Sequence, residues 1–170
     1  MASFLNHILK QFMNTLILFF MSILSVKTMQ VESSAFKAGN SIPVKYTCEG
    51  KNINPPISFK QIPQEAKSLA LIIEDPDATK GTFDHWVIWN IEPSTQIEEN
   101  SAPGIEGKNG SGKVEYTGPC PPAGTGIHHY YFKVYALDKK LSLEKGSGKI
   151  QLQKAMQGHN CAGRNDWIVY

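Results

Sequence analysis

The chain has 170 residues, which is the length of one domain with a single hydrophobic core. Its hydrophobic content of 41%, aromatic content of 10% and formal net charge of +2 are those of an ordinary globular protein. A nearly neutral chain without a basic stripe argues against nucleic acid as a partner.

The first predicted element is an apolar run near the N-terminus. Met13–Val26 is almost wholly apolar, follows a basic segment and gives way to polar sequence, which is typical of a secretory signal peptide. The run is shorter than the roughly 20 residues of a membrane-spanning helix. We therefore expect residues 1–28 to be a signal peptide or an N-terminal anchor. In the cleaved case the mature chain begins between about Ser25 and Glu32 and holds no stable membrane span. Residues 33–170 then form a periplasmic or secreted domain.

Three runs of apolar and β-branched residues predict strands. They are Ser68–Glu74, His85–Ile91 and Tyr130–Leu137. Alternation along the second run is expected to place four side chains on one face, namely His85, Val87, Trp89 and Ile91. Ile42–Thr47 and Val114–Thr117 are weaker strand candidates.

Segments rich in Pro, Gly, Asn and Ser separate these runs, and helical patterns are few. The only predicted helix of the domain is Lys149–Gln157, which Gly158 would end. This spacing favours a mainly β fold, an antiparallel sandwich with a short C-terminal helix, over a parallel βαβ sheet.

The cysteines leave their pairing open. Cys48, Cys120 and Cys161 are an odd number, so one disulfide in an oxidising compartment would leave one thiol. At least one is expected to be a small buried apolar residue.

Polar residues gather where the three predicted strands end or begin. Asp75 and Asp77 follow the first strand, His85 opens the second, and His128 and Tyr130 open the third. One rim of a sheet could bring these side chains together. The alternative is that Asp75-Pro76-Asp77 is a turn and that each histidine has a structural role.

Two long motifs in this order resemble the phosphatidylethanolamine-binding protein (PEBP) family, in particular its short bacterial, Raf kinase inhibitor-like branch. They are LALIIEDPDATKGTFDHWVIWNI and YTGPCPPAGTGIHHYYFKVYALD, with support from YTCEGKNINPPISF upstream and a GH pair near the C-terminus. The resemblance implies a two-sheet Greek-key β-sandwich with a small pocket for anionic groups such as phosphate or a phospholipid headgroup. The pocket residues it implies are Asp75, Asp77, His85, Pro121, Pro122, Gly126, His128 and Tyr130.

The chain departs from the family pattern in three places. His129 stands where most members have an arginine, and Thr79 stands where many have a proline. The C-terminal GHNCAGRNDWIVY carries polar residues where relatives continue with apolar ones. This segment is therefore not expected to pack over the pocket in the way the family pattern implies.

The residues of the pocket suit a binding protein. Pro121 and Pro122 stiffen the approach, the glycines bring backbone N–H groups close to a ligand, and protonated His85 and His128 would bond its oxygens, with the Tyr130 hydroxyl. Asp75 is better suited to orienting a histidine than to contacting an anion.

We therefore expect a non-catalytic protein without a cofactor that binds an anionic small molecule or a phospholipid headgroup. Inhibition of a protease or kinase through a surface loop is an alternative that the family resemblance allows. A hydrolase is a second one, although G-x-S-x-G is absent and Cys120 lacks an evident base. Asp75, His85 and His128 have suitable types for metal ligands, but their spacing is not diagnostic, and no metal is expected.

Overall fold

The structure is a computed structural model that describes residues 29–94, 96–161 and 165–169. Its elements in chain order are β1 (Gln30–Glu32), the 3-10 helix η1 (Val44–Tyr46), β2 (Ser58–Lys60), β3 (Ser68–Asp75), β4 (Phe83–Ile91), β5 (Ile105–Glu106), β6 (Tyr130–Leu137), α2 (Lys149–Met156) and β7 (Asn165–Val169). The expected signal peptide or anchor lies outside the described residues. Within them, no helix has the length and apolar character that crossing a membrane requires.

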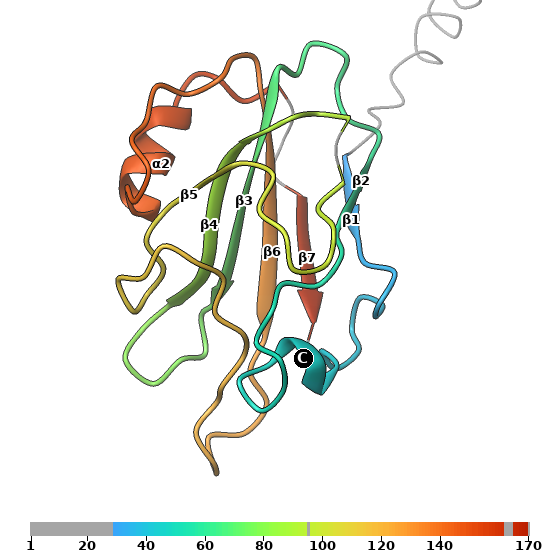
Figure 1. Cartoon of the computed structure of the whole chain (residues 1–170), viewed down its shortest axis with the longest axis vertical. Coiled ribbons are helices and arrows are strands. Elements are labelled where there is room, and N and C mark those ends of the chain that lie inside the picture. The colour runs from blue at the N-terminus through green and yellow to red at the C-terminus, as the bar shows by residue number, and fades with distance from the viewer. Residues whose placement is uncertain (1–28, 95, 162–164, 170) are drawn as a thin grey trace, which may run out of the picture.

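Within the described residues, the strands all pair antiparallel and form two sheets (Figure 1). The larger sheet has the order β5-β4-β3-β6-β7, and the smaller one joins β1 to β2. At the centre of the larger sheet, Ile73 of β3 lies opposite Trp86 of β4 on one side and Phe132 of β6 on the other. The expected mainly β fold with two antiparallel sheets and a short C-terminal helix is confirmed.

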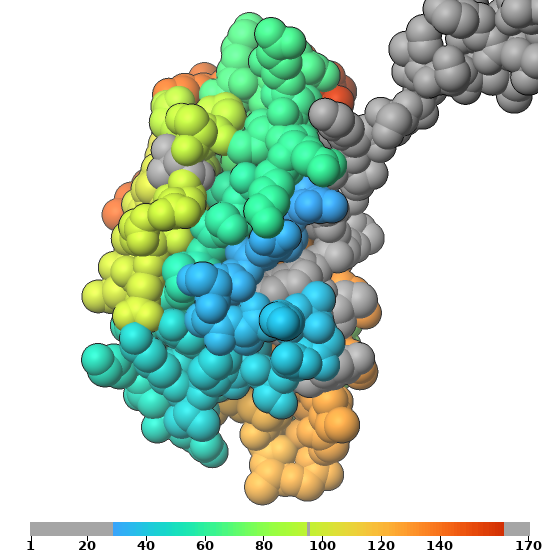
Figure 2. Space-filling model, turned by 90° about the vertical axis from the view of Figure 1, so that its right-hand side faces the viewer, coloured from blue at the N-terminus to red at the C-terminus, as the bar shows by residue number. Residues whose placement is uncertain are grey.

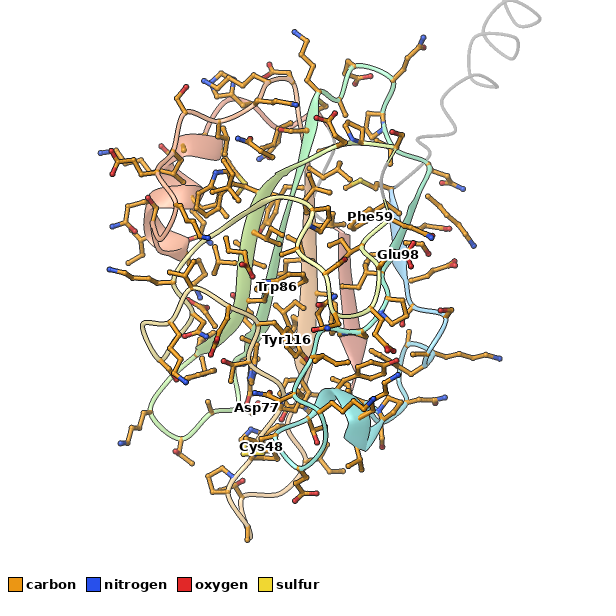
Figure 3. All side chains as sticks on the ribbon, in the orientation of Figure 1. Cys48, Phe59, Asp77, Trp86, Glu98 and Tyr116 are labelled. Carbon is orange, nitrogen blue, oxygen red and sulfur yellow. A yellow bond between two sulfur atoms is a disulfide. The ribbon has the colours of Figure 1, made fainter. Side chains whose placement is uncertain are left out.

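Both faces of the larger sheet are covered, and β3 is therefore buried at every position. One face packs against the small sheet and the loops around it, with Ile73, Trp86 and Phe132 in its core. The other face packs under α2, whose Leu152 and Met156 cover Ile72 and its neighbours. Each large apolar side chain buried in this way contributes about 1.5–3 kcal/mol. Figure 3 shows Trp86 and Tyr116 together in the interior, and their rings meet edge to face at 5.8 Å.

A bulge at Asn90 changes which face Ile91 occupies. Asn90 has a φ of 58°, and β4 has one residue more than β3 between the pairs Leu71–Ile88 and Leu69–Ile91. The Asn90 side chain fixes the bulge by bonding both backbone groups of Leu141, at 2.8 and 3.0 Å. Ile91 therefore packs with Trp86 and Ile88, and the expectation that it shares a face with Val87 and Trp89 is wrong.

The two weaker strand candidates are also wrong. Pro43 begins a helical turn, since the Tyr46 N–H donates to its carbonyl at 2.9 Å, so Ile42–Thr47 contains η1 instead of a strand. Val114–Thr117 is irregular because the Asn109 amide organises it, donating to Glu115 O at 3.1 Å and to the Thr117 hydroxyl at 2.8 Å.

A disulfide joins Cys48 to Cys120 across a sequence separation of 72 residues. Cys161 is the thiol left over, half-buried against the core, and burial raises its pKa. Disulfides of this kind are typical of proteins outside the reducing cytoplasm.

Candidate functional site

The sheet register brings the three polar strand ends to one rim. β4 and β6 both run antiparallel to β3, so the end of β3 meets the beginnings of β4 and β6. Asp75 is the last residue of β3, His85 is the third residue of β4, and His128 comes two residues before β6. Each of these three residues is only 4% exposed.

These three residues line one pocket of about 500 Å³. Its other walls come from the loop after β3, from Gly110 and Ser111, and from the segment that carries Cys120, Pro121 and Pro122. Lys80 is the cationic side chain among the lining residues and is exposed. The pocket thus has a buried carboxylate–imidazole floor and an exposed rim.

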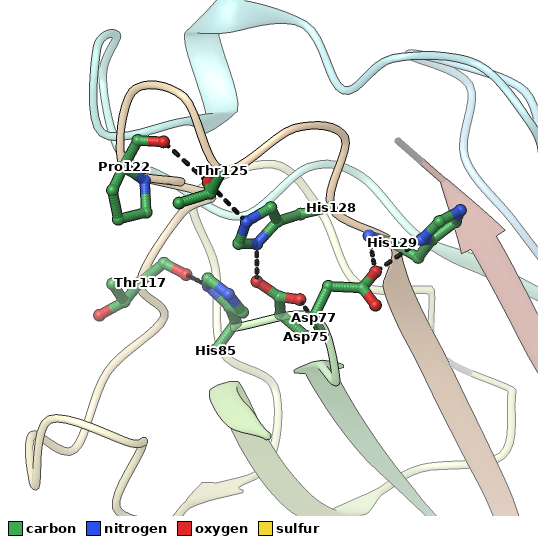
Figure 4. A network of polar contacts seen from close by, with 8 residues as sticks. All are labelled: Asp75, Asp77, His85, Thr117, Pro122, Thr125, His128 and His129. Carbon is green, nitrogen blue, oxygen red and sulfur yellow. Dashed lines mark hydrogen bonds and ion pairs between the residues drawn. The ribbon is translucent and has the colours of Figure 1, made fainter. Parts of the chain in front are cut away.

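A chain of hydrogen bonds runs through His128 (Figure 4). Its Nδ1 lies 2.7 Å from Asp75 Oδ2, and its Nε2 lies 2.9 Å from the Thr125 hydroxyl. Thr125 in turn donates to Pro122 O at 2.7 Å. Since the side chains of His128 and Asp75 are only 2% and 5% exposed, water screens their interaction weakly.

Comparison with known proteins shows to which family this chain belongs. The family model described as phosphatidylethanolamine-binding protein matches residues 32–165. The chain belongs to the phosphatidylethanolamine-binding protein family.

The relatives place it in the bacterial and archaeal branch of the PEBP family. A UPF0098 protein of Pyrococcus horikoshii is 48% identical over 136 residues, which are 75% of this chain and 69% of that protein. The structure of a putative PEBP homolog from Chlamydia trachomatis matches with a TM-score of 0.79 and 42% identity, covering 84% of this chain and 95% of that one. Escherichia coli YbcL, described as a new member of the mammalian PEBP family, matches with a TM-score of 0.74 and 28% identity, over 83% and 97% of the two chains.

His85 differs from His128 in its electrostatics within the PEBP pocket. Burial lowers the pKa of His85, although the bond to Thr117 O and the charge of Asp75 oppose this. Its Nδ1–H donates to Thr117 O at 2.7 Å, and its ring packs edge-on against Phe83 and Tyr130. His85 is therefore neutral near pH 7, with a lone pair on Nε2.

Asp77 lies outside the pocket. Its Oδ2 accepts bonds from His129, from Nδ1 at 2.6 Å and from the backbone N–H at 2.9 Å, and these bonds lower the pKa of Asp77. Neither residue is among those lining the pocket, whereas Thr79, another expected departure from the family pattern, is.

Tyr130 and Gly126 also do not line this pocket. Tyr130 borders a neighbouring cavity of about 250 Å³ that shares Cys120 and Pro121 with it, and its buried hydroxyl has no hydrogen-bond partner among the described residues. Burial raises the pKa of Tyr130. Gly126 has a φ of 86°, and a Cβ there would meet nothing within 4 Å. Its backbone conformation, and not a close approach, is what requires glycine.

Two threonines orient the histidines, and the sequence analysis predicted neither of them. Thr117 binds His85 through its carbonyl, which carries no side-chain signal. Thr125 lies between two glycines, three residues before His128. This spacing was the one sequence signal that its hydroxyl could reach the histidine. Among the residues with a described placement, no three His, Cys, Asp or Glu side chains gather as a metal-binding group.

Proposed function

We propose that this protein binds small ligands carrying a phosphate group in the pocket at the end of β3, without catalysing a reaction. The observation that supports this best is the convergence of His85 and the His128–Asp75 pair on one pocket. Two imidazoles can donate charge-assisted hydrogen bonds to anionic oxygens once they are protonated, each worth about 1.5–3 kcal/mol. The match to the PEBP family supports a small ligand.

A hydrolase is the second candidate, because Thr125, His128 and Asp75 form a hydroxyl–imidazole–carboxylate chain like that of hydrolytic triads. In such a triad the nucleophile's proton points to the imidazole. Here the Thr125 hydroxyl donates to Pro122 O, so its proton is already engaged. This supports binding over hydrolysis.

Binding of an anion at His85 should take up a proton. With Nδ1–H directed at Thr117 O, a neutral His85 offers an anion only the lone pair of Nε2, which repels it. Because burial places the pKa of His85 below the ordinary value of about 6.5, the free protein holds little of the charged form at neutral pH. Affinity should therefore rise as the pH falls from neutrality through the lowered pKa of His85. The rise ends when the ligand and the carboxylates become protonated.

Isothermal titration calorimetry tests this with two probes, inorganic phosphate and glycerophosphoethanolamine. The second is the water-soluble headgroup of a phospholipid, and its phosphodiester keeps one negative charge between about pH 5 and 8, so its pH dependence reports on the protein. Tighter binding of glycerophosphoethanolamine than of phosphate would identify a headgroup site, and the reverse a phosphate site.

His85→Ala and His128→Ala should each weaken binding about tenfold or more, and His85→Ala should also flatten the pH dependence. His159→Ala is the matched control, because that histidine pairs with Asp138 at 3.0 Å and does not line the pocket. Affinities that neither pH nor either substitution changes, in variants shown to be folded, would contradict the proposal.

A further inference from the structure

His128 has no hydrogen-bonding capacity left for a ligand in this structure. Each imidazole nitrogen makes one hydrogen bond in the plane of the ring. Nδ1 is occupied by Asp75 at 2.7 Å and Nε2 by the Thr125 hydroxyl at 2.9 Å (Figure 4). An anion can therefore reach this histidine only if one of these two partners leaves.

Thr125 is the partner that can leave. The Asp75 side chain is 5% exposed and fixed at the end of the central strand, whereas Thr125 lies in an exposed loop. The Thr125 hydroxyl donates its one proton to Pro122 O at 2.7 Å, so its oxygen accepts from His128 Nε2–H. A ligand oxygen bound to His128 would make the same contact.

The loop around Thr125 is exposed and carries two glycines. Residues 120–127 are exposed, and Figure 2 shows this part of the chain projecting from the lower end of the molecule. Gly124 and Gly126 flank the threonine with φ values of 82° and 86°, and a Cβ at either would meet nothing within 4 Å. Besides its hydroxyl bonds, Thr125 makes a long backbone bond to Pro122 O at 3.2 Å.

We propose that Thr125 is a displaceable internal ligand of His128, and that an anion binds by replacing its hydroxyl and opening the 121–127 loop. This inference rests on the proposed function, because it concerns the same pocket. It makes Thr125 a residue that sets affinity: the closed loop lowers the apparent affinity by the fraction of molecules in which His128 is occupied.

Thr125→Val tests the proposal, since valine keeps the branched shape and removes the hydroxyl. Without the competing bond, inorganic phosphate and glycerophosphoethanolamine should bind about three- to tenfold more tightly than to the parent protein. Thr125→Ser keeps the hydroxyl and should stay within about twofold of the parent. Calorimetric titration of the three folded proteins measures the difference.

Hydrogen exchange of the Thr125 amide gives a second readout. Phosphate should speed this exchange in the parent, because the loop opens on binding, whereas a loop that closes over the ligand would slow it. Slower exchange, or a valine variant that binds no more tightly than a parent that does bind, would overturn the inference and leave the proposed function standing. Binding by the valine variant alone would support the inference. Absence of binding by both proteins, for both probes, would overturn the inference and the proposed function together.

Discussion

At the scale of single residues, two adjacent histidines lie in different surroundings. His128 is buried against Asp75 in the pocket floor, and His129 is about 40% exposed and paired with Asp77. Neighbouring side chains in an extended segment point to opposite sides, and this separates the two. His129, where the family resemblance led us to expect an arginine, is thus a surface position in this chain.

His129→Arg should leave phosphate affinity within about threefold of the parent. An arginine at this position can keep the ion pair with Asp77. Neither position 129 nor Asp77 lines the pocket. Titration calorimetry under the conditions used for the parent measures this. A tenfold change would show that the Asp77–His129 pair belongs to the binding site.

The residues of the candidate site differ in how far the sequence predicts their convergence on one pocket. Asp75, His85 and His128 were predictable because each stands at the end of a strongly apolar run, where antiparallel pairing gathers polar groups. Thr125 was not, because the flanking glycines allow several backbone conformations and so leave the direction of its hydroxyl open.

At the scale of elements, α2 is held to the sheet by ion pairs. Lys149, its first residue, lies 2.5 Å from Asp84 Oδ1 and 3.1 Å from Glu74 Oε2, and Lys133 of β6 also binds Glu74. A cation at a helix N-terminus interacts unfavourably with the helix dipole. The ion pairs of Lys149 with Asp84 and Glu74 offset this interaction. Burial would lower the pKa of Lys149, but its bonds to Asp84 and Glu74 raise it.

Lys149→Met should lower the free energy of unfolding by about 1–3 kcal/mol, because it leaves Asp84 partly buried without its cation. The control is Lys145→Met, which removes an equal charge from an exposed position and should change stability by less than about 0.5 kcal/mol. Urea denaturation measures both. Equal effects of the two substitutions would mean that the network does not stabilise the contact between α2 and the sheet.

The strength of each element's apolar pattern decided whether it could be predicted. The runs that became β3, β4 and β6 were found nearly to their ends, as was α2. β1, β2 and β5 have two or three residues each, too few for alternation to show, and β7 begins with the polar Asn165 and Asp166. The bulge at Asn90 was missed because an asparagine in a strand does not reveal whether its φ is positive.

At the scale of the whole molecule, the disulfide connects the loop after η1 to the wall of the pocket. Cys48 N donates to Pro119 O at 3.0 Å, so the two segments also share a backbone bond beside the bridge. Cys120 lines both the pocket and the neighbouring cavity.

Replacing Cys48 and Cys120 together by alanine should lower the free energy of unfolding by about 2–5 kcal/mol, because the bridge closes a long loop in the unfolded chain. Urea denaturation measures the loss, with Cys161→Ala as the control for removing a cysteine outside the bridge. A double variant as stable as the parent would show that the bond adds no net stability.

The small sheet begins at the rim of the molecule opposite the pocket. Val31 of β1 pairs with Phe59 of β2, and Figure 3 places Phe59 toward the end of the molecule away from Cys48 and Asp77. The described chain thus enters at the rim opposite the pocket (Figure 1). The eight residues of β6 span about 26 Å between the two rims, at about 3.3 Å per residue. A surface coupled directly at the start of β1 would therefore lie at the rim away from the pocket, and a ligand arriving from solution could reach the mouth of the pocket without passing that surface.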